Sequence, residues 1–386
     1  MEATIRGGKA AIVGIGETEF LRRSPRSLLE MTITACELAI SDAGLSPADI
    51  DGFVCNRNSH GADEIAFALG IDERPYSVVT DTLGGTAPAG EALIHAQLAI
   101  EAGLAKHVLV YYGFQGSKPG GPYGFHAREP LKADLEMPVG YFSQPSYFAM
   151  IANRYAHEYG LSEEELASIA ITYRKWAMLT PTAQKRKPLD LESYRESPMI
   201  STPLRVADCC LLTDGASAYI VSSVDRASDM PHTPVVIRSV GIGTHRWPQS
   251  MVFTQNPDLM AFPGRQSARI AFEDAGMTPA DLDLAQIYDG FSISALIQTE
   301  MMGICEPGEG AKFYHAGHGM PGGKLPINTS GGHMSGGYLP GITLVTEAVR
   351  QLRHAREGEA QVKDAEVCAV AGLGGNSHST AILTRS

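Results

Sequence analysis

The sequence has 386 residues, of which 44% are hydrophobic and 19% charged, with a formal net charge of −12. This composition indicates a soluble globular protein with core for about two domains, and it excludes a disordered chain. The negative charge provides no attraction to nucleic acids or anionic membranes, so we expect neither as a partner.

The start of the chain and its cysteines indicate a cytoplasmic protein. The first residues lack the regions of a signal peptide, and no apolar stretch approaches the roughly 20 residues that span a bilayer. The six cysteines are scattered and form no CxxC pair. We therefore expect reduced thiols, a cytoplasmic location and no metal site.

Two copies of one motif indicate an internal duplication. Leu38–Asp51 and Ile270–Asp283 share the pattern A-x-x-D-A-G-[LM]-[ST]-P-A-D-[IL]-D. The glycine predicts the end of a helix, and the Ser-Pro or Thr-Pro pair predicts the start of a second, short helix. Upstream of each copy lies a V-G-I-G strand, at 13–16 and 240–243.

The chain continues with the same helix–strand order in both halves. The expected segments are a helix at 91–103 and a strand at 107–112, then a helix at 343–352 and a strand at 367–371. Alternating strands and helices predict α/β layers with buried strands. We therefore expect two pseudo-symmetric α/β halves, residues 1–234 and 235–386.

An insertion at 114–200 interrupts the first half. It begins with a glycine-rich loop and then turns helical, over 147–159 and 162–176. Ser162 followed by Glu165 predicts a capping box at the start of the second helix. Insertions of this length often cover an active site, which we expect here.

Three further segments resemble the active-site loops of the thiolase superfamily, in its sterol-carrier-protein-thiolase-like branch. They are Thr213-Asp-Gly-Ala-Ser-Ala-Tyr219, Tyr288-Asp-Gly-Phe-Ser292 and Gly331-Gly-His-Met-Ser-Gly-Gly-Tyr-Leu-Pro-Gly341. Thiolases carry His-Asp-Ala-Phe or Asn-Glu-Ala-Phe in the second segment and Gly-His-Pro-x-Gly in the third. Tyr288 and Tyr338 therefore stand where thiolases have histidine or asparagine. The resemblance covers residues 10–385 and implies a thiolase fold with five α-β-α-β-α layers.

The cysteines of thiolase chemistry are missing. That chemistry needs a thiolate at a helix N-terminus. The corresponding loop is Thr80–Gly90, and the nucleophile position falls at Gly85 or Thr86. The second thiolase cysteine should fall near Ala371–Asn376, which also contains none. We therefore do not expect an acyl-cysteine intermediate.

This pattern is similar to that of the steroid side-chain-cleaving aldolases, called lipid-transfer-protein-like aldolases. The resemblance implies retro-aldol cleavage of a steroid β-hydroxyacyl-CoA thioester into a ketosteroid and a shorter acyl-CoA, such as propionyl-CoA. It implies no cofactor in this chain. It also implies an acyl-CoA-binding partner with an OB-fold and a zinc ribbon, which can carry zinc, and a homodimer within a heterotetramer.

Tyr288 and Tyr338 are the candidate acid and base, and the sequence does not assign the two roles. A tyrosine has a reference pKa near 10, so ionising it at pH 7 costs about 4 kcal/mol. The glycine-rich loops at 84–85, 331–337 and 374–375 are expected to supply compensating backbone N–H groups. Because Tyr338 lies among glycines, we expect it to have few packing partners.

His333 is the third candidate catalytic residue. It is the titratable group nearest to Tyr338 in sequence, and either hydrogen-bonds a tyrosine or lies on the surface. Asp289 is expected to orient a loop. A metal cluster of His315, His318 and His333 is less favoured than a solvated loop, because no carboxylate stands at ligand spacing.

Two further features have alternative interpretations. Cys305 is a weak candidate nucleophile, because nothing at its predicted helix end lowers a thiol pKa. Lys185-Arg-Lys187 is either a solvated charge run or a site for CoA phosphates. For the whole chain, a non-catalytic lipid or acyl-CoA carrier on a degenerate thiolase fold, and an acyltransferase with another nucleophile, remain alternatives to the aldolase.

Overall fold

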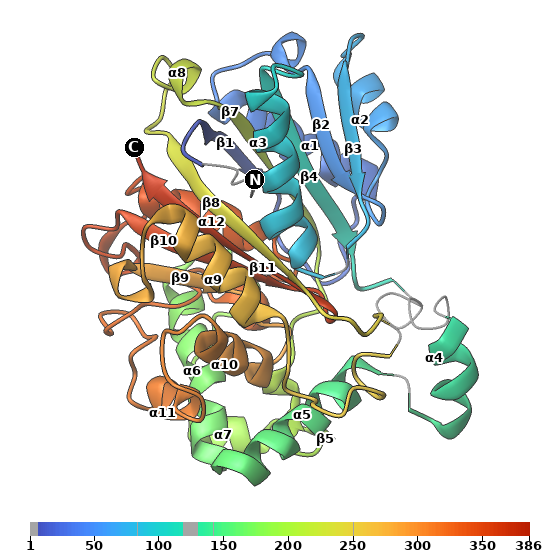
Figure 1. Cartoon of the computed structure of the whole chain (residues 1–386), viewed down its shortest axis with the longest axis vertical. Coiled ribbons are helices and arrows are strands. Elements are labelled where there is room, and N and C mark those ends of the chain that lie inside the picture. Colours follow the sequence, from blue (N-terminus) through green and yellow to red (C-terminus); the bar gives the residue numbers. More distant parts are fainter. Residues whose placement is uncertain (1–6, 83, 119–129, 142, 250) are drawn as a thin grey trace.

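The computed structural model describes residues 7–386 except 83, 119–129, 142 and 250. Its strands and helices form two halves with a similar order of elements (Figure 1). The first half contains β1 Ala10–Glu17, α1 Leu28–Asp42, β2 Gly52–Asn56, α2 Ala62–Leu69, β3 Tyr76–Thr80, α3 Ala92–Glu101, β4 His107–Gln115, β7 Asp214–Ser223 and α8 Val224–Ala227. The second half contains β8 Val235–Thr244, α9 Gly264–Ala275, β9 Leu284–Ile287, α10 Ser292–Met301, α11 Gly310–His315, α12 Ile342–Leu352, β10 Val367–Leu373 and β11 Ser377–Arg385.

Within the described residues, nine strands form one sheet in the order β3-β2-β4-β7-β1-β8-β11-β10-β9. Apart from the extra edge strand β3, the order is symmetric about the seam between β1 and β8, which joins Ala11 to Val236 and Ile12 to Val235. On either side, β2 pairs in parallel with β4, and β9 with β10. This symmetry confirms the predicted α/β fold, and the expected boundary between residues 234 and 235 falls directly before β8.

Helices pack on the outer side of the sheet, and two further helices pack on its inner side, between the strands of the first half and those of the second half. α1 packs outside β1, β7 and β4, and α9 packs outside β8 and β11. On the inner side, α3 contacts β2, β4 and β8, while α12 contacts β9, β10 and β7. In β1, Ala11 and Val13 belong to the cluster beneath α1, whereas Ala10 and Ile12 belong to the central core. The layers follow the predicted α-β-α-β-α order.

The duplicated motif has the same structural role in both halves. Asp49 and Asp281 each cap a short 3₁₀ helix by accepting hydrogen bonds from the residue three positions earlier. The last aspartate of each motif then accepts two backbone N–H groups at the start of a strand, β4 for Asp51 and β10 for Asp283. Each motif therefore ties a helix end to a neighbouring strand.

Glycines in the V-G-I-G strands allow the outer helices to approach closely. A Cβ atom on Gly16 would lie 2.2 Å from the carbonyl oxygen of Ala35 in α1. A Cβ atom on Gly243 would lie 2.1 Å from the carbonyl oxygen of Pro263, next to α9. The repeated glycines thus serve helix–sheet packing.

The predicted insertion corresponds to the segment between β4 and β7, of which residues 119–129 lie outside the described part. Its elements are α4 Pro130–Leu135, α5 Gln144–Tyr159, α6 Glu163–Leu179, α7 Leu191–Glu196, β5 Met199–Ser201 and β6 Leu204–Arg205. The capping box of Ser162 and Glu165 is confirmed. In Figure 1, α5, α6 and α7 lie beneath the second half, and α4 projects to one side.

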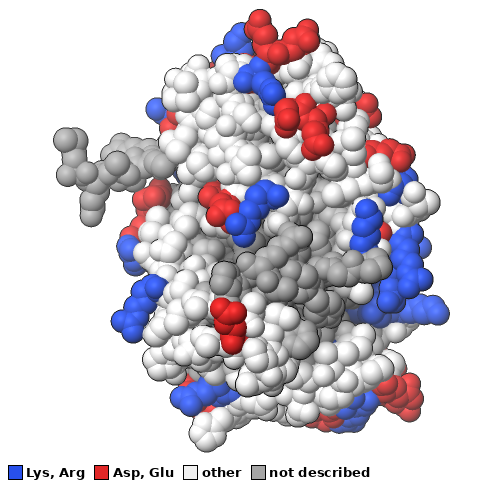
Figure 2. Space-filling view, turned by 90° about the vertical axis from the view of Figure 1, so that its right-hand side faces the viewer, with Lys and Arg blue, Asp and Glu red and all other residues white. Residues whose placement is uncertain are grey.

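Charges are spread unevenly over the surface. On the face shown in Figure 2, lysine and arginine side chains gather toward one edge, while acidic side chains are scattered. The chain therefore concentrates positive charge locally despite its net charge of −12. No helix within the described residues is both long and apolar enough to cross a bilayer.

Candidate active site

The two tyrosines singled out in the sequence meet in one pocket. Tyr288 follows β9 directly, and Tyr338 lies in the loop before α12. Their hydroxyl oxygens are 2.8 Å apart, and their ring centroids are 6.3 Å apart in an edge-to-face arrangement. Tyr288 is only 8% exposed. The two loops of the second half therefore present a hydrogen-bonded pair of phenols.

Backbone contacts fix both tyrosines. The Tyr288 N–H group donates to the Ala371 carbonyl oxygen at 3.0 Å, and the Tyr288 carbonyl oxygen accepts from Gln298 Nε2 at 2.7 Å. The Tyr338 N–H group donates to Thr213 Oγ1 at 2.8 Å. Because Thr213 opens the first thiolase-like motif, that motif connects the end of the insertion to the loop that carries Tyr338.

Tyr338 is packed among aromatic rings. Its ring centroid lies 5.7 Å from that of Phe114 and 5.3 Å from that of His333. The expectation of few packing partners is therefore wrong. The glycines around Tyr338 lack side chains, but its neighbours come from β4 and from other parts of the second half.

His333 is fully buried, so the surface interpretation is wrong. Asp289 accepts hydrogen bonds from the backbone N–H groups of His333 and Met334, which agrees with its expected role of orienting a loop. The His333 Nδ1 atom lies 3.0 Å from an Asp289 oxygen, but outside hydrogen-bond geometry. Its Nε2 atom faces the Leu339 carbonyl oxygen at 3.2 Å. The His333 ring therefore packs against the phenol rings, and its nitrogen atoms do not hydrogen-bond the tyrosine hydroxyl groups.

The pocket beside the phenols has a volume of about 220 Å³ and a largely apolar wall that includes several aromatic rings. Besides both tyrosines, its lining includes Tyr112, Phe114, Phe148, Phe253 and Phe291. The insertion supplies Phe148 of α5 and the segment 209–212. The insertion therefore covers the site, as its length suggested.

Gly85, the expected nucleophile position, lies against the ring of Tyr288. A Cβ atom on Gly85 would lie 2.4 Å from Tyr288 Cδ2, which is inside van der Waals contact. The ring of Tyr288 therefore takes the space that a side chain at position 85 would need. At the neighbouring position, the buried Thr86 hydroxyl faces the Gly372 carbonyl oxygen at 3.3 Å. Neither position offers an activated nucleophile.

The glycine-rich loops contribute less to the pocket than expected. Gly84, Gly374 and Gly375 line it, whereas the described lining includes no residue of 331–337. The N–H groups of Gly85 and Gly374 already donate to backbone carbonyl oxygens. These two groups are therefore unable to stabilise a phenolate or an enolate.

Burial raises the pKa of Tyr288 and of Tyr338 well above the ordinary value. Taking a phenol out of water disfavours its charged form. Both hydroxyl groups are therefore protonated at neutral pH, and one donates to the other. The pair can donate a hydrogen bond to an oxyanion, or relay a proton without forming a free phenolate.

Two thiols in the pocket were missed by the sequence analysis. Cys209 and Cys210 line it just before β7, and the Cys210 N–H group donates to the Gly290 carbonyl oxygen. Burial raises the pKa of Cys209 to about 12 and that of Cys210 further. Both are protonated and weak nucleophiles at neutral pH. Their one sequence signal was their position immediately before the first thiolase-like motif.

The remaining candidates lie elsewhere. Cys305 is in the loop between α10 and α11, and burial raises its pKa to about 12. His315 is exposed and His318 partly exposed, whereas His333 is buried. Within the described residues, no group of three His, Cys, Asp or Glu side chains is placed to hold a metal ion.

Lys185 lies beside the loop that carries Tyr338. Its N–H group donates to the Ser335 carbonyl oxygen, and its side chain is close enough to Cys209 for their charges to interact. Burial, Arg174 and Arg22 lower the pKa of Lys185. No carboxylate within the described residues pairs with this ammonium group. Positive charge without a paired carboxylate therefore lies near Cys209, which lines the pocket.

Known proteins resemble this chain over most of its length. A family model described as Thiolase C-terminal domain-like matches residues 247–385. A 17-hydroxy-3-oxo-4-pregnene-20-carboxyl-CoA lyase from Mycobacterium tuberculosis is 37% identical over 363 residues, covering 90% of this chain and 92% of that protein. A steroid side-chain-cleaving aldolase from Thermomonospora curvata is 34% identical over 361 residues, covering 90% of each.

A solved structure extends the similarity to three dimensions. The structure named Ltp2-ChsH2(DUF35) aldolase matches with a TM-score of 0.91 and 32% identity, covering 99% of both chains. The similarity thus includes both halves and the insertion. The chain therefore belongs to the thiolase superfamily, in the sterol-carrier-protein-thiolase-like branch that contains the steroid side-chain-cleaving aldolases.

Proposed function

We propose that this chain catalyses retro-aldol cleavage of a steroid side chain carried as a β-hydroxyacyl-CoA thioester. The β-hydroxyl group loses its proton, the bond between the α- and β-carbons breaks, and its electron pair forms the thioester enolate. A proton then adds to the α-carbon. The products are a ketosteroid and a shorter acyl-CoA, such as propionyl-CoA, and the proton lost at oxygen balances the proton gained at carbon.

The contact between Tyr288 and Tyr338 carries this proposal. Because both pKa values are raised, a free phenolate is an expensive intermediate. The 2.8 Å contact instead suits a relay, in which one phenol takes the substrate proton while passing its own to the other, and the second phenol delivers its proton to the α-carbon. His333 is assigned a positioning role, since its ring packs 4.9 Å from that of Tyr288.

The surroundings support a CoA thioester of an apolar acid. Aromatic and other apolar side chains make up most of the wall, which suits a fused-ring hydrocarbon. The charges of Lys185, near the pocket residue Cys209, and of the neighbouring Arg174 and Arg22 suit the phosphate groups of CoA. An acyl transfer finds less support, because Gly85 has no side chain and the pocket thiols have raised pKa values.

We further propose that the active form contains a partner of the DUF35 type. The solved structure named Ltp2-ChsH2(DUF35) aldolase covers this chain almost completely, which supports a similar assembly. In the proposed assembly, two copies of this chain bind two partner chains. Zinc, where present, is bound by the partner. Co-expression followed by light scattering on the purified complex measures this stoichiometry.

The test is turnover of a synthetic β-hydroxy steroid-CoA by the assembled complex, with ketone release as the readout. Tyr288→Phe and Tyr338→Phe should each reduce kcat by about 100-fold or more, the usual contribution of acid–base catalysis. Tyr112→Phe is the matched control, because Tyr112 lines the same pocket outside the pair. Near-normal turnover of both variants would refute the tyrosine mechanism. A wild-type complex that binds the substrate without cleaving it would favour a carrier.

A further inference from the structure

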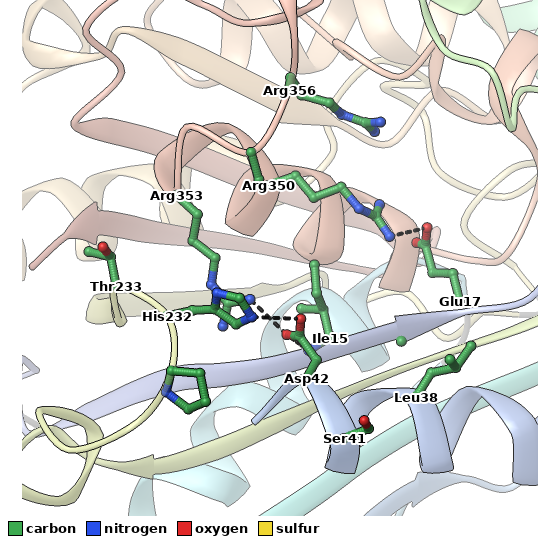
Figure 3. A pocket seen from close by; sticks show the side chains of 13 residues that line it. Ile15, Glu17, Leu38, Ser41, Asp42, His232, Thr233, Arg350, Arg353 and Arg356 are labelled. Atoms are coloured by element: carbon green, nitrogen blue, oxygen red, sulfur yellow. Dashed lines mark hydrogen bonds and ion pairs between the residues drawn. The ribbon is translucent and has the colours of Figure 1, made fainter. Parts of the chain in front are cut away.

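A second pocket of about 730 Å³ lies where the two halves meet (Figure 3). It shares no lining residue with the tyrosine pocket. β1 and α1 of the first half form one side, and the end of α12 forms the other, with the segment 231–233 at its edge. Three arginines from the end of α12 line it, so we call it the arginine pocket. They are Arg350, Arg353 and Arg356.

Two of these arginines are committed to carboxylates. Arg350 Nη2 lies 2.6 Å from Glu17 Oε2. Arg356 forms an ion pair with the fully buried Glu347. Each ion pair is neutral, and the Arg350–Glu17 pair links α12 to β1, so neither arginine needs a further ligand.

Arg353 is different. Its side chain is 6% exposed, and only Nη1 has a partner, Asp42 Oδ2 at 2.7 Å. Nε and Nη2 find no acceptor within the described residues. Asp42 does not satisfy them: its Oδ2 accepts from Arg353 Nη1 and from the Ile15 N–H group, and its Oδ1 lies 3.3 Å from His232 Nε2. Figure 3 shows Arg353 and His232 converging on Asp42 from the same side.

The two unpaired nitrogens form one edge of the guanidinium group. Their N–H bonds point in parallel, with the spacing that matches two oxygens of a carboxylate or phosphate. Leaving such donors buried without an acceptor costs about 1–3 kcal/mol each. Buried groups in this state call for a missing partner. The chemistry of this edge specifies an oxyanion.

We propose that the arginine pocket binds a small oxyanion on the free edge of Arg353. The ligand is a phosphate or a carboxylate, free or at the end of a small organic molecule, for which the volume leaves room. His232, with 47% of its side chain exposed, turns to admit the anion. Ser41 and Thr233 line the same pocket and supply hydroxyl donors.

Calorimetric titration of the full chain with sodium phosphate, sodium sulfate and sodium acetate, at constant ionic strength, tests the site. At least one anion should give a saturable heat in the wild type, and their ranking separates phosphate-type from carboxylate ligands. Arg353→Lys keeps the charge but loses the two-pronged edge, and should weaken binding at least tenfold. Arg269→Gln removes an exposed charge on α9 and should change nothing.

A second variant changes affinity in the opposite direction. Asp42→Asn keeps an acceptor for the Ile15 N–H group but removes the competing negative charge, so it should tighten binding several-fold. Phosphate and sulfate also stabilise proteins by exclusion from the surface, but that effect grows linearly with concentration and does not depend on Arg353. The proposal is overturned if no anion gives a saturable heat in the wild type, if Arg353→Lys binds equally well, or if Asp42→Asn binds more weakly.

Discussion

A side chain at position 85 and the ring of Tyr288 compete for the same space. The predicted contact of 2.4 Å between a new Cβ atom and Tyr288 Cδ2 leaves no room for both. A nucleophilic side chain at position 85 and a tyrosine ring at position 288 therefore exclude each other in this arrangement. Reversing one alone does not restore a thiolase-like site.

This coupling is measurable by a double-mutant cycle. Gly85→Cys should destabilise the protein by about 1–3 kcal/mol, because overpacking shifts the ring or the loop. Tyr288→Asn removes the ring. In that background, Gly85→Cys should lower the free energy of unfolding by clearly less. Urea unfolding of the four proteins gives the interaction free energy. Strictly additive effects would show that the two positions do not share space.

At the scale of elements, His378 joins β11 to α9 and α10. It is fully buried, with Nδ1 2.7 Å from Ser267 Oγ and Nε2 3.2 Å from Gln298 Oε1. Gln298 Oε1 only accepts, so Nε2 carries the hydrogen and Nδ1 accepts from the serine. Since Gln298 also donates to the Tyr288 carbonyl oxygen, this network supports the active-site loop.

Burial lowers the pKa of His378 to about 3, from an ordinary value of 6.5. Between these values the unfolded chain binds a proton that the folded chain does not. The free energy of unfolding should therefore fall as pH drops below about 6.5, by up to about 1.4 kcal/mol per pH unit. Urea unfolding at pH 7, 6 and 5 measures this slope. His378→Gln should show a shallower slope, and parallel curves for the two proteins would contradict the assignment.

The duplicated aspartates give a second element-scale prediction. Asp51 and Asp283 each accept two backbone N–H groups at the start of a strand. Asp51→Ala and Asp283→Ala should each cost about 1–3 kcal/mol, since charged acceptors are lost. Thermal unfolding compares them with Asp72→Ala, at an exposed position. Markedly unequal losses would show that the two copies no longer have equivalent roles.

At the scale of the whole molecule, β3 forms one end of the sheet and offers an edge for assembly. Val79 in β3 is 57% exposed and Phe67 in α2 is 88% exposed. Uncovered strand edges with apolar neighbours tend to be paired in the assembled protein. We expect a homodimer through this edge. Phe67→Glu should shift the mass measured by light scattering toward the monomer, whereas Ile200→Glu, an exposed apolar position on β5, should not.

Local signals in the sequence were sufficient for the order of elements, because glycine stops, capping boxes and alternating helices and strands act over a few residues. The proximity of Tyr288 and Tyr338 followed from the resemblance to thiolase loops. Three features did not follow from the sequence: the burial of His333, the pocket thiols of Cys209 and Cys210, and the unpaired nitrogens of Arg353. Each depends on packing between segments far apart in the chain, and a glycine-rich loop looks solvent-exposed until its neighbours are known.

Both phenols come from the second copy of the duplicated unit, as do Phe253 and Phe291 of the pocket wall, whereas Tyr112 and Phe114 come from β4 and Phe148 from the insertion. The tyrosine pair and part of the cavity wall are thus encoded in separate stretches of the gene. Natural selection can change β4 and the insertion, and with them the shape of the cavity, while the contact between the phenols stays intact. A single ancestral duplication would in this way have freed one copy to diversify while the other kept the pair.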